Sequence, residues 1–126
     1  METKIYEYPI IHYPRVMWVC FNGRAEEIKD RFVDTRIGSW NGLLDENSNM
    51  QTWDVEDKKD GRYGYLVCCK SREKAKDDYL VHEASHVAVD VFRVIGCDVC
   101  DATQEPFAYL QQFLFSCLKD AKKNKK

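Results

Sequence analysis

Two histidines and a glutamate stand close together in the HEASH sequence of residues 82–86. The surrounding segment has apolar residues at helical spacing, so we expect a helix that ends near residue 95. Positions four apart share one face of a helix, and the imidazoles of His82 and His86 can therefore reach one ion. Glu83 points about 100° round the helix, where its carboxylate can reach a metal-bound water. The spacing predicts a divalent-metal site, with zinc as the expected cofactor.

Two histidines are half of a zinc site, because structural zinc has four protein ligands and catalytic zinc has three and a water. Cys97 and Cys100 form a C-x-x-C that ten residues separate from His86, and they could close a tetrahedral site of two imidazoles and two thiolates. The same cysteines could instead pack the loop that follows the helix. Asp90 lies eight residues after His82, where it either hydrogen-bonds a ligand histidine or is solvated.

A second pattern follows on the next expected helix, where Glu105 begins an E-x-x-A sequence. HEASH on one helix, then E-x-x-A on the next after a short loop, resembles the gluzincin metallopeptidases. The compact version resembles the minimal gluzincins and a class of small phage and prophage proteins. The resemblance covers about residues 79–118, roughly a third of the chain.

The resemblance implies a role for each matching residue. In that family the two histidines and the later glutamate hold zinc, which here means His82, His86 and Glu105. The first glutamate of the motif, here Glu83, is the general base. A small residue follows the ligand glutamate by three positions, and here it is Ala108. The strand expected over residues 63–69 corresponds to the edge strand that holds an extended substrate.

One part of the gluzincin pattern is missing from the chain. Gluzincins supply a downstream His or Tyr that steadies the oxyanion, but no histidine follows His86. Tyr109, one turn beyond Glu105, and Tyr79 are the candidates, and both also fit as packing residues. Two functions therefore stay open: a zinc-dependent peptidase that acts on a peptide or protein, and a non-catalytic, metal-stabilised binding protein with either ligand set.

The elements that must position these residues read as strands first and then two helices. We expect strands at residues 5–14, 16–21, 50–55 and 63–69, a short helix at 24–33, a loop at 38–49 with a short strand near Trp40, and helices to 95 and over 103–119. This order predicts an α+β fold, with helices packed on one face of a small mixed or antiparallel sheet. The expected organisation is one zincin-like domain over residues 1–118, with a basic tail at 119–126.

Composition narrows the class of protein. The chain has 126 residues and a net charge of −2, and its tail is basic, so the rest is acidic. An acidic body argues against a nucleic-acid-binding surface, which needs clustered Lys and Arg. No apolar run is long enough for a signal peptide or a membrane span, which predicts a cytoplasmic protein. Reduced cysteines fit that compartment, and Cys20, Cys68 and Cys69 lie in apolar runs typical of a core.

Overall fold

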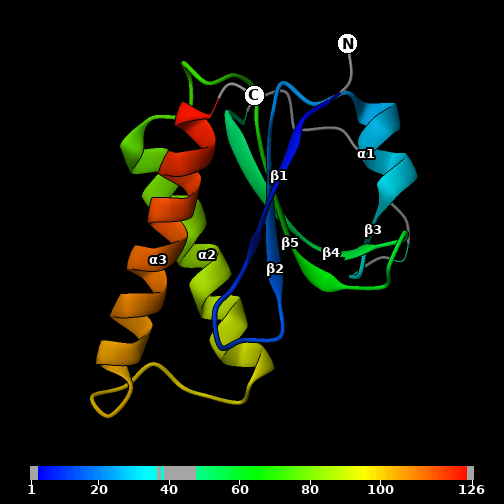
Figure 1. The fold of residues 1–126 in the computed structure, drawn as a ribbon. Coiled ribbons are helices and arrows are strands. Elements are labelled where there is room, and N and C mark those ends of the chain that lie inside the picture. The colour runs from blue at the N-terminus through cyan, green and yellow to red at the C-terminus, as the bar shows by residue number, and fades with distance from the viewer. Residues whose placement is uncertain (1–2, 37, 39–47, 125–126) are drawn as a thin grey trace. The chain divides into compact units, whose positions relative to one another are not determined.

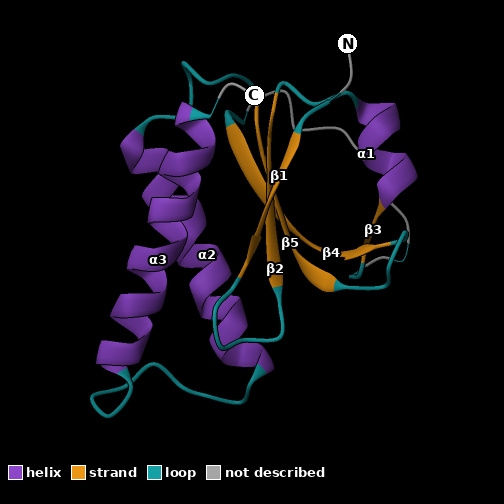
Figure 2. Cartoon of the chain, in the orientation of Figure 1, coloured by secondary structure: helices purple, strands orange, loops and turns teal. Residues whose placement is uncertain are grey.

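The computed structural model describes residues 3–36, 38 and 48–124. Within these ranges the chain forms three helices and a five-stranded sheet, which confirms the α+β prediction (Figure 1, Figure 2). The chain divides into two compact units, Met1–Ala75 and Lys76–Lys126. The first unit holds the sheet and one helix, and the second holds the other two helices. The domain boundary expected at residue 118 stays a prediction.

The sheet of the first unit is mixed. Its strands are β1 (Ile5–Pro9), β2 (Val16–Phe21), β3 (Phe32–Asp34), β4 (Met50–Asp57) and β5 (Tyr63–Cys69). The strand order is β1-β2-β5-β4-β3, with β2 and β5 parallel and the other neighbours antiparallel. The strands predicted at 16–21 and 63–69 are confirmed with those bounds. However, β5 pairs with β2 on one side and with β4 on the other, so it is not the edge strand that the gluzincin resemblance implies.

The two central strands are apolar along their whole length because both of their faces are buried. Every residue from Val16 to Cys20, and from Gly64 to Cys69, is buried. Such near-continuous apolar runs are typical of strands that pair in parallel inside a protein. Gly64 lies opposite Val16, and a Cβ at this glycine would stand 1.9 Å from the Val16 carbonyl oxygen. Only glycine allows the two backbones to approach this closely.

In the first unit β4 runs two residues past its predicted end at 55, and two other predicted elements end earlier than expected. β1 stops at Pro9, because the following residues form a turn in which the Ile10 N–H donates to the Arg15 carbonyl (3.0 Å) and His12 has a φ of 71°. Helix α1 (Ala25–Arg31) ends two residues earlier than predicted, because Phe32 and the residue after it pair with β4 instead. The short strand expected near Trp40 falls outside the described residues.

One face of this sheet packs against α1, and the residues between them form a contiguous hydrophobic core. The ring centroids of Trp18 and Phe32 lie 5.1 Å apart at its centre. The buried members of this core are Val16, Trp18, Cys20, Ile28, Phe32, Val55, Leu66 and Cys68. The core therefore joins α1 to four of the five strands, and its cysteines lie on the two central ones.

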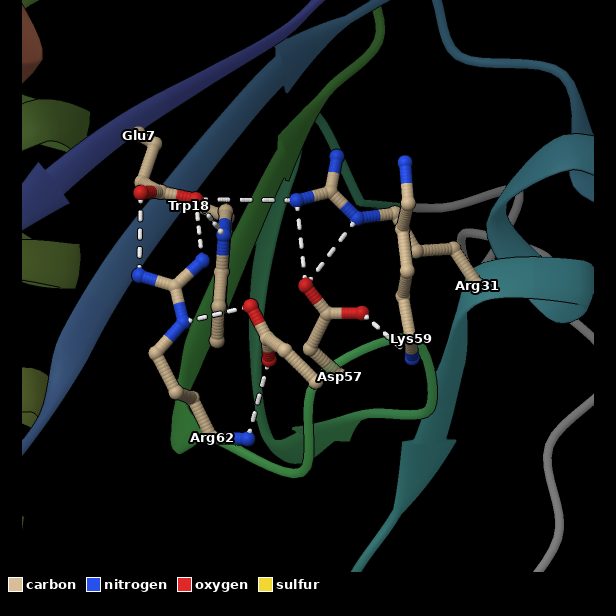
Figure 3. Close-up of polar contacts among 7 residues, drawn as sticks. Glu7, Trp18, Arg31, Asp57, Lys59 and Arg62 are labelled. Carbon is tan, nitrogen blue, oxygen red and sulfur yellow. Dashed lines mark hydrogen bonds and ion pairs between the residues drawn. The ribbon is translucent and has the colours of Figure 1, made fainter.

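A charged network ties β1 to the turn between β4 and β5 (Figure 3). Both terminal nitrogens of Arg62 donate to the Glu7 carboxylate, at 2.9 and 2.8 Å, and the Trp18 indole N–H donates to it at 3.0 Å. Asp57 is 1% exposed and accepts from Arg31 at 3.1 Å. The Arg62 hydrogen bond is the largest cause that lowers the pKa of Glu7 below its ordinary value. The network thus holds an edge strand to a distant turn.

The second unit is a helical hairpin of α2 (Asp77–Val94) and α3 (Gln104–Lys123), which lie side by side (Figure 1). The apolar residues of each helix recur at helical spacing and are buried, as Leu80, Ala84, Val87 and Val91 are on α2. α3 continues four residues beyond its predicted end at 119, and Ala121 in this extension is fully buried. No helix among the described residues is long and apolar enough to cross a membrane.

Candidate metal centre

Helix α2 carries the two histidines on its exposed face. Asp77 and Asp78 lie in its first turn and Arg93 in its last, which suits the helix dipole at both ends. The buried apolar residues occupy the opposite face, and this fixes the rotation of the helix. His82 and His86 are both exposed as a result. The predicted helix is confirmed to within one residue of its expected end.

The two imidazoles meet through their Nε2 atoms, which share a hydrogen bond. The Nε2 atoms of His82 and His86 are 3.1 Å apart, and the ring centroids are 4.6 Å apart with the planes at 83°. Two nitrogens bound to one tetrahedral zinc at about 2.0–2.1 Å are about 3.3 Å apart. The observed separation is within a few tenths of an ångström of that value. The donor set and its spacing therefore fit two positions of a zinc site.

Glu83 lies beside this pair but is itself buried. The residue is 6% exposed, whereas the His82 side chain is 66% exposed. One carboxylate oxygen of Glu83 lies 4.0 Å from Nε2 of His82. The carboxylate is thus close to the nitrogen that would bind a metal.

Glu105 lies at the other end of the hairpin. Lys119 approaches Asp77 at 3.4 Å and Gln111 hydrogen-bonds Ser85, so α3 runs antiparallel to α2. Ser85 adjoins His86, and Glu105 precedes Gln111 by six residues, or about 9 Å along the helix axis. Glu105 is exposed in the first turn of α3. The spacing along α2 brings the two histidines together, and the hairpin does not bring Glu105 to them.

The supporting residues suggested by the sequence are also apart from the histidine pair. Ala108 and Tyr109 are exposed on the first turns of α3, Tyr109 by 67%. Asp90 is buried on α2, and its carboxylate oxygen accepts from two nitrogens of Arg93 at 2.8 and 2.6 Å. These two hydrogen bonds tie Asp90 to an arginine one turn away, toward the end of the helix.

Cys97 and Cys100 lie in the loop between the helices as free, exposed thiols. The Thr103 hydroxyl accepts from the Cys100 backbone N–H at 2.9 Å and lies 3.6 Å from its sulfur. The hydrogen bond between the Cys100 sulfur and the Thr103 hydroxyl is the largest cause that lowers the pKa of Cys100, followed by one with the backbone of Ala102. A lowered pKa favours the thiolate, which is the form that binds metals and reacts.

Neither proposed four-ligand or three-ligand set is assembled in the hairpin. Among residues 3–36, 38 and 48–124, no three His, Cys, Asp or Glu side chains are grouped so that they could hold one ion. What the structure does supply is the two-imidazole pair. Metal binding itself stays a prediction, as do the roles of Glu83 and Glu105.

Two residues near these groups were not singled out in the sequence. Ser85 donates to the Val81 carbonyl at 2.9 Å and joins α2 to α3 through Gln111. Thr103 organises the cysteine loop, and its hydroxyl also donates to the Asp98 carbonyl. A threonine directly before a helix is a recognisable capping signal, but here its side chain makes no capping hydrogen bond and instead bonds to residues of the loop. The Ser85 contact depends on the hairpin register and has no local sequence signal.

Comparison of the chain with models of protein families, with curated proteins and with solved structures found no match.

Proposed function

We propose that this chain is a zinc-binding protein whose metal is held by His82 and His86 on the exposed face of α2. The observation that supports it most is the 3.1 Å separation of the two Nε2 atoms, which is close to what tetrahedral zinc requires. Neutral imidazole is a common zinc ligand, and exposure of both rings gives an ion access from solvent.

The remaining coordination positions are expected to hold water or a donor from a bound molecule. Glu105 is the third ligand that the gluzincin resemblance implies. It lies about 9 Å along α3 from Gln111, which contacts Ser85 beside His86, and it is not grouped with the pair in this hairpin. A site with two protein ligands binds its ion more weakly than a closed one. It also leaves more of the ion open to an incoming group.

Peptide hydrolysis is the second candidate function, and Glu83 is the residue that favours it. Bound zinc supplies a water whose pKa is lowered toward about 7. A carboxylate oxygen of Glu83 lies 4.0 Å from Nε2 of His82, which places it close to where such a water would bind and so where it could accept a proton. Without turnover, the same site describes a metal-stabilised binding protein with a peptide or protein partner.

Zinc affinity of single-histidine variants tests the first proposal. The chain has three histidines, so His12→Ala is a matched control that removes an imidazole far from the pair in sequence. His82→Ala and His86→Ala should each weaken zinc binding by about 100-fold or more, because loss of even a supporting contact costs about 10- to 100-fold. A chromophoric chelator competing for zinc measures the affinity. Equal affinity in all four proteins would overturn the assignment.

Glu83→Gln separates the enzyme from the binding protein. This change keeps the size of the side chain and removes its basicity, so zinc affinity should stay near the wild-type value while hydrolysis is lost. Both proteins are incubated with zinc and with unfolded protein or peptide libraries, and the products are read by mass spectrometry. If wild type cleaves nothing, or if both cleave equally, the binding protein is the better description.

A further inference from the structure

The two central strands bring a pair of cysteines together inside the first unit. Cys20 on β2 lies directly opposite Cys68 on the parallel strand β5. Their sulfur atoms are 3.0 Å apart and share a hydrogen bond. Both thiols are free, and their residues are 0% and 6% exposed.

The backbone geometry at this pair is compatible with a covalent link. Neighbouring strands lie about 4.8 Å apart, which is within the range of about 4.4–6.8 Å that Cα atoms of a disulfide span. A sulfur–sulfur bond is about 2.05 Å long, so the two sulfurs need to approach by about 1 Å. Both side chains already point into the same core and toward each other.

We propose that Cys20 and Cys68 are the two halves of a latent disulfide that joins β2 to β5 when the chain is oxidised. The oxidant is a low-molecular-weight disulfide such as oxidised glutathione. One cysteine thiolate attacks it, forms a mixed disulfide and releases one thiol. The second cysteine attacks the mixed disulfide, forms the Cys20–Cys68 bond and releases the second thiol. Two protons leave the protein thiols, and the two electrons reduce the oxidant.

The burial of the pair determines when this reaction can occur. The pKa of the Cys68 thiol lies well above its ordinary value, chiefly because of its hydrogen bond with Cys20 and then because of burial. A thiol that is buried and protonated reacts slowly, and a mixed disulfide needs space that the core lacks. The Cys20–Cys68 disulfide should therefore form readily while the chain folds, and only slowly once the protein is folded. The exposed pair at Cys97 and Cys100 provides the contrast, since it is open to oxidants at once.

A link at this position would close a long loop. The two cysteines are 48 positions apart in sequence, and the segment between them contains α1, β3 and β4. Closing such a loop restricts the unfolded chain and stabilises the folded one. For a protein of this size the melting temperature should rise on the order of 10 °C.

Refolding of the full chain in a glutathione redox buffer tests the proposal. Free thiols are then blocked, and the protein is digested with trypsin without reduction. The cleavage sites place Cys20 in residues 16–24 and Cys68 in residues 63–70, while Cys97, Cys100 and Cys117 share one peptide over 94–119. We expect peptide 16–24 joined to peptide 63–70, and the join should disappear on reduction.

Cys69 is the matched control, because it lies on the same buried strand and the same tryptic peptide but points to the opposite face. Cys69→Ala should keep the link, and Cys20→Ala should abolish it. Fragmentation of the linked wild-type peptides identifies the bonded sulfurs without any variant.

Two results would overturn the proposal. In the first, the refolded wild-type chain carries Cys20 entirely as a blocked thiol or bonded to a cysteine other than Cys68. In the second, the Cys20–Cys68 link forms but the oxidised chain melts no higher than the reduced chain. A link of that kind would not be compatible with the paired strands.

Discussion

Replacement of Gly64 by alanine tests the closest backbone approach in the sheet. An added Cβ would stand 1.9 Å from the carbonyl oxygen of Val16 and 2.9 Å from Cζ3 of Trp18. Carbon and oxygen in close non-bonded contact stay about 3.3 Å apart, so the overlap with the carbonyl is about 1.4 Å. The strands have to separate, because a backbone oxygen within a paired strand cannot rotate away as a side chain can.

The expected cost follows from this overlap. An extra methyl group in a packed core costs about 1–3 kcal/mol when side chains can adjust, and more when they cannot. We therefore expect Gly64→Ala to lower the free energy of unfolding by about 3 kcal/mol or more. A protein of this kind has a total of about 5–15 kcal/mol, so the variant should be partly unfolded or far less stable.

Urea denaturation of wild type, Gly64→Ala and Gly61→Ala measures this difference. Gly61 is a matched control in the turn before β5: it has a φ of +75° and its nearest Cβ neighbour would be 4.0 Å away. Alanine there should cost only about 1–2 kcal/mol, from the left-handed backbone. If Gly64→Ala is no more destabilising than Gly61→Ala, the parallel pairing of β2 and β5 in this register is refuted, and the cysteine pairing with it.

Three further predictions concern the candidate site and the charged network. Glu105→Ala should leave zinc affinity within about 2-fold of wild type, because the side chain lies about 9 Å along α3 from Gln111, which contacts Ser85 beside His86; a strong loss in the competition assay would instead favour the gluzincin ligand set. Cys97→Ser with Cys100→Ser should leave the spectrum of the cobalt-substituted chain unchanged, and intense thiolate charge-transfer bands in wild type that the double variant lacks would support the closed site. Glu7→Gln should reduce the dependence of stability on acid pH. The pKa of Glu7 is lowered from 4.5 in the folded chain, chiefly by Arg62. Ionised Glu7 therefore stabilises the folded chain above pH 4.5, and this stabilisation is lost as the pH falls through the lowered pKa. The carboxylate is partly exposed, so the difference in urea midpoints should correspond to about 0.5–1 kcal/mol, and identical pH profiles would contradict it.

The sequence was sufficient for those elements whose pattern is local. The apolar runs at 16–21 and 63–69 and the helical spacing from Leu80 to Val91 led to the correct strands and helix. The sequence was not sufficient where a segment's conformation depends on the strand with which it pairs. β3 has only three residues, and Phe32 is extended because β4 supplies its partner, which no local pattern indicates.

In the candidate site too, local features could be predicted from the sequence and long-range ones could not. The His82 and His86 spacing is local, and the two nitrogens do meet. The position of Glu105 relative to them depends on where α2 ends and how α3 aligns with it. α2 continues for eight residues after His86, to Val94, and the hairpin register then leaves Glu105 near that end. The order of motifs along the chain carries no information on this register.

X-ray absorption at the zinc edge of the loaded wild-type chain tests the central claim most directly. The measurement reports the type, number and distance of the atoms bound to the metal. The account predicts about one zinc per chain, with two imidazoles at about 2.0–2.1 Å and oxygen at the remaining positions. One imidazole should disappear in His86→Ala and none in His12→Ala. A sulfur shell at about 2.3 Å, or a protein that retains no zinc, would contradict it.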